Sequence, residues 1–160
     1  MMRRVAVLCL LLSATPAVLA DVLTGRVVSI ADGDTLTLVA ANKRQHRIRL
    51  SAIDAPEQAQ RFGDRSRTAL NSLAYGKVVR AECGSRDQYG REVCKILLNG
   101  ADINLLQLRS GMAWWQRKFA WEQSPADRAA YEQAEFQAKI RRVGLWADKN
   151  PVPPWKWRRQ

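Results

Sequence analysis

The pattern of apolar and polar positions divides the chain into short strands followed by helices. Apolar residues are frequent in the segment 22–30, and the segments 35–39 and 46–50 alternate polar and apolar residues as half-buried strands do. Turn-forming residues separate these segments, so we expect three strands joined as a meander. Two more strand-like segments, 78–82 and 92–98, predict a second hairpin.

Helical patterns lie between and after the strands. Asp64 is placed to cap a helix that runs to about Tyr75 and stops at Gly76. Asp102 is placed to cap a short helix that continues through Arg109. Both helices are therefore expected to begin at an aspartate side chain.

The last helix has the clearest start signal. Ser124 is the expected N-cap, and Pro125 takes the first helical position. Alanines then recur every fourth residue, which predicts a narrow packing stripe made of Ala126, Ala130, Ala134 and Ala138. The whole order of elements predicts an α+β fold: a five-stranded barrel of the oligonucleotide-binding (OB) type with three packed α-helices.

The chain ends differ in composition from the middle. Two arginines precede an apolar run at 5–12, and small residues lead up to Ala20, as in a secretory signal peptide. The run is too short to span a bilayer, although an uncleaved anchor is the alternative. We therefore expect a signal peptide at 1–20, a single folded domain at 21–148 and a Pro/Trp/basic tail at 149–160. The protein is expected to be exported to the periplasm or secreted.

Charge adds a preference for polyanionic partners. Lys and Arg total 26 against 15 for Asp and Glu, which gives a formal net charge of +11 and a sequence pI of about 10.3. Such a balance favours nucleic acid or an anionic membrane surface, while a merely soluble basic protein is the alternative. The tail could contact nucleic acid or lie along the domain and bury its tryptophans. Nothing in the sequence indicates an oligomer, so a monomer is expected.

Two cysteines remain after the expected cleavage. Cys83 and Cys94 flank a turn-like segment at 87–91, and a hairpin there would bring them to the same level of adjacent strands. Export would permit a disulfide, which we favour over two unpaired thiols. A metal site on these cysteines is disfavoured because His46 is the only histidine. We expect His46 itself to be a surface residue.

Three carboxylates and two arginines are the candidates for chemistry. Asp34, Asp54 and Glu57 stand at strand ends or turns, and clustered carboxylate oxygens suit a hard cation such as Ca²⁺ or Mg²⁺. Arg49 and Arg91 lie near strand ends, and a guanidinium matches the geometry of phosphate oxygens. Taken one by one, each acid could be a turn former and each arginine a solvated surface group.

Three segments together resemble the signature of the staphylococcal nuclease (thermonuclease) family. They are Asp-Gly-Asp-Thr at 32–35, the segment 49–57 that begins Arg-Leu and ends Ile-Asp-Ala-Pro-Glu, and Asp-x-Tyr-Gly-Arg at 87–91. They occur in the family's order, and the resemblance covers about residues 22–148. It implies an OB barrel and Ca²⁺-dependent hydrolysis of DNA and RNA, although another divalent cation could serve. The 5′-oxygen would leave and the products would carry 3′-phosphates.

The resemblance also implies roles for individual residues. Asp34 and Asp54 match carboxylate metal ligands, and Ala55 matches a position whose backbone carbonyl binds the metal. Glu57 matches the residue that positions or activates the attacking water.

Five other residues match positions that contact the substrate. Arg49 and Arg91 match a phosphate-binding pair, and Tyr89 matches a tyrosine near the bound phosphate. Aromatic positions that stack on the base in the family fall at Arg117 and Phe119 here. This departure leaves the base preference open.

Two other kinds of protein remain compatible with the basic charge. One is an OB module that binds nucleic acid without cutting it, for which placing three carboxylates beside phosphate would bring no advantage. The other is a cationic envelope or membrane-surface protein. We expect DNA and RNA as partners and no stable membrane association after cleavage.

Overall fold

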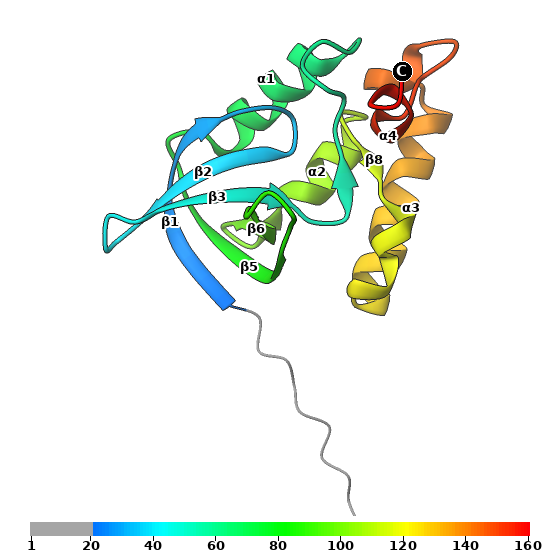
Figure 1. The fold of residues 1–160 in the computed structure, drawn as a ribbon. Helices are drawn as coiled ribbons and strands as arrows, with labels where there is room; N and C mark the ends of the chain where they lie inside the picture. Colours follow the sequence, from blue (N-terminus) through cyan, green and yellow to red (C-terminus); the bar gives the residue numbers. More distant parts are fainter. Residues whose placement is uncertain (1–20) are drawn as a thin grey trace, which may run out of the picture.

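The computed structural model describes residues 21–160, and it shows a barrel of β-strands with helices packed against it (Figure 1). The expected signal peptide lies outside the described residues. The barrel strands are β1 (Asp21–Ile30), β2 (Thr35–Ala40), β3 (Gln45–Leu50), β5 (Val78–Arg86) and β6 (Glu92–Leu98).

Pairing between β3 and β6 closes the barrel. The other strands pair antiparallel in the order β3-β2-β1-β5-β6, and β3 then meets β6 in parallel with Leu50 opposite Cys94. The two-residue strand β7 (Ala101–Asp102) extends the outer edge of β6. The closed five-stranded barrel confirms the predicted OB fold and its α+β class.

A second, very short sheet lies beside the barrel and was not predicted. Strand β4 (Ile53–Asp54) pairs antiparallel with β8 (Trp114–Trp115), with Asp54 opposite Trp114. The backbone N–H of Gln116 also donates to the carbonyl of Ala52. Pro56 follows closely and lacks the N–H needed to continue the pairing. This sheet fixes the backbone that carries Asp54.

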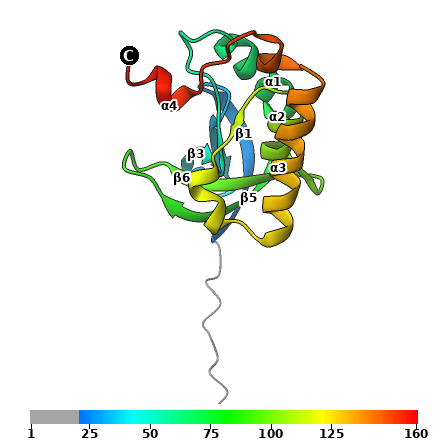
Figure 2. The same ribbon diagram turned by 90° about the vertical axis from the view of Figure 1, so that its right-hand side faces the viewer.

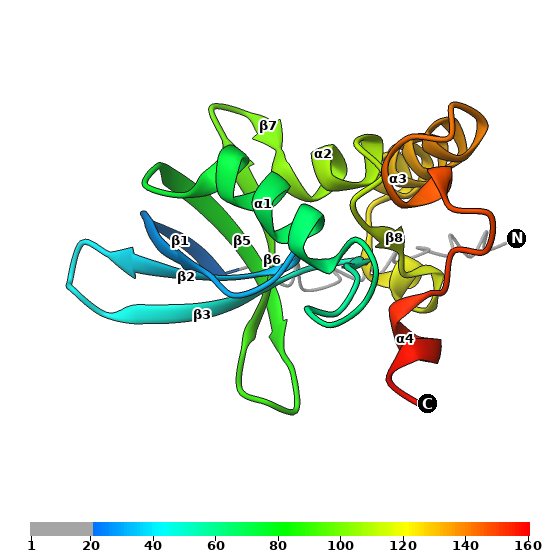
Figure 3. The ribbon, with the colours of Figure 1, turned by 90° about the horizontal axis from the view of Figure 1, so that it is seen from above.

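The helices cover the barrel from one end and one side (Figures 2 and 3). They are α1 (Gly63–Ala74), α2 (Ile103–Arg109), α3 (Pro125–Ile140) and the single turn α4 (Pro154–Trp157), with 3₁₀ turns η1 (Arg117–Glu122) and η2 (Gly144–Ala147). Among residues 21–160, none of these helices combines the length and the apolar character needed to cross a bilayer.

The starts of the helices test the expected caps. The Asp102 side chain accepts a hydrogen bond from the N–H of Leu105, as predicted. The prediction for α1 was wrong: its N-cap is Phe62, in the left-handed region with φ of 71°, and it makes no side-chain cap. Asp64 lies in the first turn instead, where a carboxylate still favours the positive end of the helix dipole.

Helix α3 begins as predicted but packs through a different face. Ser124 accepts from the N–H of Asp127, and Pro125 opens the helix. Ala126 is exposed and Ala130 is only half-buried, so the expected alanine stripe is wrong at its first two positions. The buried face consists of Tyr131, Ala134, Glu135 and Ala138. Its spacing of three and four residues follows the helical repeat more closely than a strict four-residue stripe does.

The structure joins Cys83 and Cys94 in a disulfide between β5 and β6. The two residues are directly opposite in the antiparallel register, and their Cα atoms are 4.0 Å apart. Both side chains lie in the hydrophobic core of the barrel. The disulfide therefore fixes the base of the hairpin whose turn carries Arg91.

His46 is buried, which contradicts the prediction of a surface residue. Only 9% of its surface is exposed, and its Nδ1 lies 3.0 Å from Oε2 of Glu92. Arg86 also contacts Glu92. Alternation along β3 places His46 on the same face as Ile48 and Leu50, so the strand period itself directs it inward.

Candidate active site

One cleft contains every metal-binding, catalytic and substrate-binding residue predicted from the sequence. It lies between the barrel, the β4–β8 sheet and the end of the chain, and has a volume of about 1140 Å³. The predicted residues that line it are Asp34, Arg49, Asp54, Ala55, Glu57, Tyr89, Arg91, Arg117 and Phe119. Segments 32–35, 49–57 and 87–91, which are far apart in the sequence, thus meet at one surface.

Arg49 joins the two aspartates at the floor of the cleft. Its Nη1 lies 2.9 Å from Oδ2 of Asp34, and its Nη2 lies 2.9 Å from Oδ1 of Asp54. A third contact goes from Nη1 to the carbonyl of Leu50. These contacts fix the plane of the guanidinium, which has five N–H donors and so keeps others for a further anion.

Asp34 is held almost fully buried by the turn after β1. Its Oδ2 accepts from the N–H of Ala55 at 2.6 Å, and the hydroxyl of Thr35 donates to its Oδ1. A Cβ on Gly33 would overlap the Oγ of Ser66, so the turn can approach α1 only with glycine at this position.

The charge of Asp34 is costly in this environment. Burial raises the pKa of Asp34 to about 7, and the carboxylates of Asp32 and Asp54 add to the rise against the opposing effect of Arg49. Asp34 and Asp54 are two buried carboxylates that lie side by side. Such a pair favours the binding of a positive charge.

Arg91 is oriented by the hairpin turn between β5 and β6. Its Nε donates to Oδ2 of Asp87 at 2.7 Å, and its Nη1 donates to the hydroxyl of Thr35 at 3.1 Å. Since Thr35 in turn donates to Asp34, a chain of hydrogen bonds links Arg91 to the buried aspartate. The Arg91 guanidinium lies over the ring of Tyr89, and its Cζ is 5.4 Å from the ring centroid.

Glu57 lies at the cleft wall, in the turn between β4 and α1. The side chain of Gln60 accepts from the backbone N–H of Glu57 at 3.1 Å, and the N–H of Gln60 donates back to the Glu57 carbonyl. The Glu57 side chain is 38% exposed. It is therefore held by its backbone while its carboxylate remains accessible to water.

The three residues predicted to bind substrate beside the arginine pair differ in how they are held. Tyr89 is 70% exposed. Nη1 of Arg117 forms an ion pair with Oε2 of Glu135 at 2.9 Å, and the Arg117 guanidinium stacks over the ring of Trp115. Phe119 is half-buried in η1. Arg117 thus presents a flat cationic surface supported by an aromatic ring.

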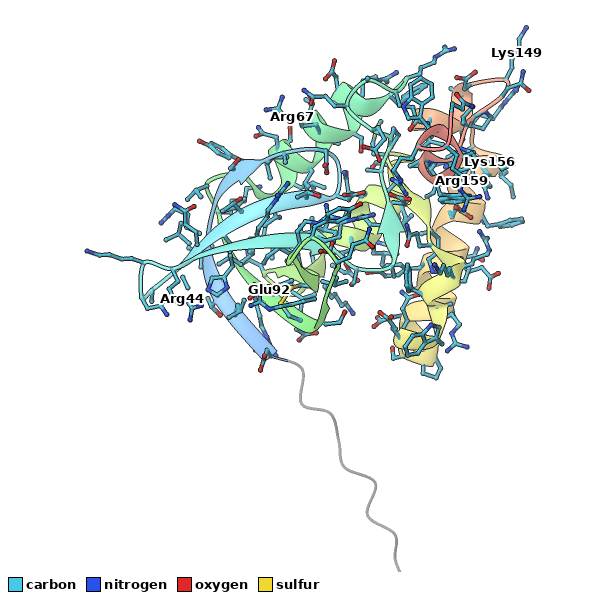
Figure 4. The ribbon with its side chains drawn as sticks, viewed as in Figure 1. Arg44, Arg67, Glu92, Lys149, Lys156 and Arg159 are labelled. Carbon is cyan, nitrogen blue, oxygen red and sulfur yellow. A yellow bond between two sulfur atoms is a disulfide. The ribbon has the colours of Figure 1, made fainter. Side chains whose placement is uncertain are left out.

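The end of the chain also lines this cleft, and the sequence did not assign it to the site. Trp155, Arg158 and Arg159 contribute to the lining, and Figure 4 marks Lys156 and Arg159 together beside the barrel. Arg158 contacts both Asp54 and Glu57. The only signal was the basic and aromatic composition of the tail, which does not say where the tail folds back.

The side chains that line the cleft limit which metal ion it could hold. Within residues 21–160, there is no group of three or more His, Cys, Asp or Glu side chains arranged to hold an ion. Two carboxylates, Asp34 and Asp54, do converge, and Ala55 follows Asp54 directly. Two carboxylates with a carbonyl and water suit a hard cation and exclude the ligand set of zinc. The residues present therefore fit an oxygen-bound, partly hydrated cation.

Several known proteins that are similar to this chain carry the name of a nuclease or endonuclease. The family model described as "Staphylococcal nuclease homologue" matches residues 47–148. A protein of Shigella flexneri named micrococcal nuclease is 38% identical over 167 residues, covering 99% of this chain and 92% of that protein. Two proteins named uncharacterized endonuclease are similarly related. That of Haemophilus influenzae is 39% identical over 137 residues, 86% of this chain and 74% of its own length. That of Escherichia coli is 37% identical over 158 residues, 98% of each.

Proposed function

The chain belongs to the staphylococcal nuclease family and is a nuclease, and on that premise we propose that it is a metal-dependent phosphodiesterase, with Ca²⁺ as the expected ion, acting on both DNA and RNA. Water attacks the phosphorus, the 5′-oxygen leaves, and the products carry 3′-phosphates. One observation carries this proposal. Two buried aspartates and two arginines from three distant segments converge in one cleft of a strongly basic protein.

The two arginines are proposed to bind the scissile phosphate. Negative charge on the phosphate oxygens grows as water attacks, and preorganised guanidinium groups stabilise it. Arg49 is oriented by Asp34 and Asp54, while Arg91 is oriented by Asp87. Because both groups are held before substrate arrives, little reorganisation is needed when the charge develops.

Glu57 is proposed to position the attacking water or to accept its proton. Its carboxylate lies at the wall of the same cleft and is partly exposed, which gives water access to it. Asp34, Asp54 and the carbonyl of Ala55 would hold the cation. When bound, such an ion polarises the phosphoryl oxygen and neutralises part of its charge.

The carboxylates separate this proposal from a module that only binds nucleic acid. Basic charge and exposed aromatic side chains serve a binder as well as an enzyme. Two buried acids at the floor of a phosphate-binding cleft repel a polyanion unless a cation neutralises them. Binding alone would therefore be stronger without Asp34 and Asp54.

Cleavage of a labelled oligonucleotide tests the proposal directly. We expect degradation of single-stranded DNA and of RNA with Ca²⁺, none with excess chelator, and 3′-phosphate product ends. Lack of cleavage with every divalent cation tried would refute the proposed activity, and cleavage that persists with excess chelator would refute metal dependence. Product ends carrying 5′-phosphates would refute the assignment of the leaving group.

A pair of matched variants tests the role of Glu57. Glu57→Gln is expected to lower turnover by about 10²–10⁴-fold, the usual contribution of a general base. Glu122→Gln removes the same charge from an exposed residue of the same cleft and is expected to leave turnover within about threefold of wild type. Equal effects of the two substitutions would show that only the charge of the cleft matters.

We also propose that the protein is exported to the periplasm or secreted and acts as a monomer without stable membrane association. The pattern of residues 1–20 and the disulfide between Cys83 and Cys94 support export. Cell fractionation with N-terminal sequencing should find the mature chain starting after Ala20. Size-exclusion chromatography with light scattering should give the mass of one mature chain.

A further inference from the structure

The chain returns to the active-site cleft at its C-terminus. Gln60, which holds the backbone of Glu57, also donates from its Nε2 to the carbonyl of Val152 at 2.6 Å. Pro154 is buried, and the ring of Trp155 packs edge-on against Trp114 with centroids 5.7 Å apart. In Figures 1 and 3 the turn α4 lies on the β8 side of the barrel. The tail is thus docked at several points and does not merely trail from the domain.

Docking brings the Arg158 guanidinium onto two carboxylates of the site. Its Nη2 lies 2.8 Å from Oδ2 of Asp54, and its Nη1 lies 2.5 Å from Oε1 of Glu57. Nη1 also donates to Oδ1 of Asp54 at 3.3 Å. These hydrogen bonds, that to Asp54 first, raise the pKa of Arg158 above its ordinary value.

The contacts of Asp54 leave little of its carboxylate available. Oδ1 faces both Arg49 and Arg158, and Oδ2 faces Arg158. The residue is 1% exposed, so water cannot replace these partners freely. A cation coordinated by Asp54 would need the oxygens that Arg158 now occupies, and it would repel the guanidinium at close range.

We propose that Arg158 competes with the divalent cation for Asp54, so that the docked C-terminal tail sets the affinity of the site for its metal. This inference rests on the proposed function, because it requires a cation at Asp34 and Asp54. In the cation-free protein, Arg158 neutralises Asp54 and Glu57. Cation binding must break these ion pairs and release the Arg158 side chain from the cleft floor.

Calcium binding measured without nucleic acid tests the proposal. Isothermal titration calorimetry of the mature chain with CaCl₂ gives a Kd that does not depend on catalysis. We expect Arg158→Gln to bind Ca²⁺ about tenfold more tightly than wild type, within the usual range of coupling between competing sites. Arg158→Lys keeps the charge and is expected to stay closer to wild type.

Arg159→Gln is the matched control. It removes the same charge from the neighbouring residue of the same cleft, so it reproduces any general electrostatic effect. We expect its Kd to lie within about twofold of wild type, since it lacks the Arg158 contacts that block Asp54. The proposal would be overturned if Arg158→Gln bound Ca²⁺ no more tightly than wild type does. It would also be overturned if Arg158→Gln and Arg159→Gln had the same Kd.

Thermal unfolding distinguishes competition from a purely structural role of Arg158. With chelator, Arg158→Gln should melt below wild type because Asp54 and Glu57 lose their partner. With saturating Ca²⁺, the gain in Tm should be larger for Arg158→Gln than for wild type. Equal gains would mean that Arg158 only supports the fold. If no variant binds any divalent cation, the proposed metal site fails and this proposal fails with it.

Discussion

The carboxylate oxygen Oδ2 of Asp87 accepts a hydrogen bond from Nε of Arg91 at 2.7 Å, which holds the Arg91 guanidinium in place at the cleft. The same side chain also accepts from the backbone N–H groups of Tyr89 and Arg91, which closes the hairpin turn. Asp87 is therefore a positioning residue for Arg91. The Arg91 hydrogen bonds keep the pKa of Asp87 below its ordinary value even though its partial burial acts in the opposite direction.

Removal of this support should weaken catalysis more than binding. We expect Asp87→Ala to lower kcat by about 10²-fold, since loss of an orienting contact that displaces a catalytic group by about 1 Å has effects of that size. Arg91→Lys keeps the charge but not the planar fork, and should show a comparable loss. Steady-state kinetics on an oligonucleotide measures both. A wild-type kcat for Asp87→Ala would mean that Thr35 alone orients Arg91.

The burial of Asp34 predicts how the stability of the metal-free protein depends on pH. Its pKa rises from 3.8 to about 7 on folding, so between these values the native state keeps a proton that the unfolded state has released. The free energy of unfolding contributed by Asp34 is therefore greatest below about pH 4 and declines as pH rises to about 7. Over the full window the change amounts to a few kcal/mol at most.

Asp34→Asn isolates this contribution because the amide does not titrate. Urea unfolding with chelator present should show the variant gaining stability relative to wild type between about pH 4.5 and pH 7.5. The side chain stays similar in size, so packing changes little. A stability difference that is the same at both pH values would show that Asp34 is ionised throughout.

The barrel was predictable because its strands alternate, and the caps at Asp102 and Ser124 were predictable because they act locally. The spacing of Asp34, Arg49 and Arg91 gained meaning only from the order of three segments, which the barrel brings together. Contacts between distant segments were not predictable. The β4–β8 pair, the contact between His46 and Glu92 and the return of Arg158 to Asp54 each depend on tertiary packing that has no local pattern.

The disulfide should stabilise the fold while contributing little to chemistry. Cys83 and Cys94 are separated by 11 positions, and closing a loop of this size contributes about 2–3 kcal/mol to stability. We expect the double variant Cys83→Ala, Cys94→Ala to unfold at lower denaturant concentration by that amount. Its kcat at low temperature should remain within about threefold of wild type, because Asp87 still orients Arg91. Unfolding of wild type with reductant provides the control; equal stability with and without reductant would contradict the prediction.

Glu135 links α3 to the strand beside the active site, although it is fully buried. Its Oε1 accepts from the N–H of Trp115 at 3.0 Å, and its Oε2 contacts Lys139 and Arg117 at 2.8 and 2.9 Å. Truncation to Glu135→Ala leaves a buried N–H and two cations without their partner. We expect a loss of about 1–3 kcal/mol in the free energy of unfolding, mainly because the buried N–H of Trp115 loses its acceptor, while both cations are partly exposed to water.

The variant Glu135→Gln separates the charge of Glu135 from its hydrogen bond. The amide oxygen can still accept from Trp115, so most of the loss should be recovered if that hydrogen bond dominates. Arg117, released from Glu135 in either variant, would no longer be held flat over Trp115. We therefore expect both variants to raise KM for an oligonucleotide more than they lower kcat. Denaturant unfolding and steady-state kinetics on the same preparations check this, and unchanged KM in both variants would show that Arg117 does not contact substrate.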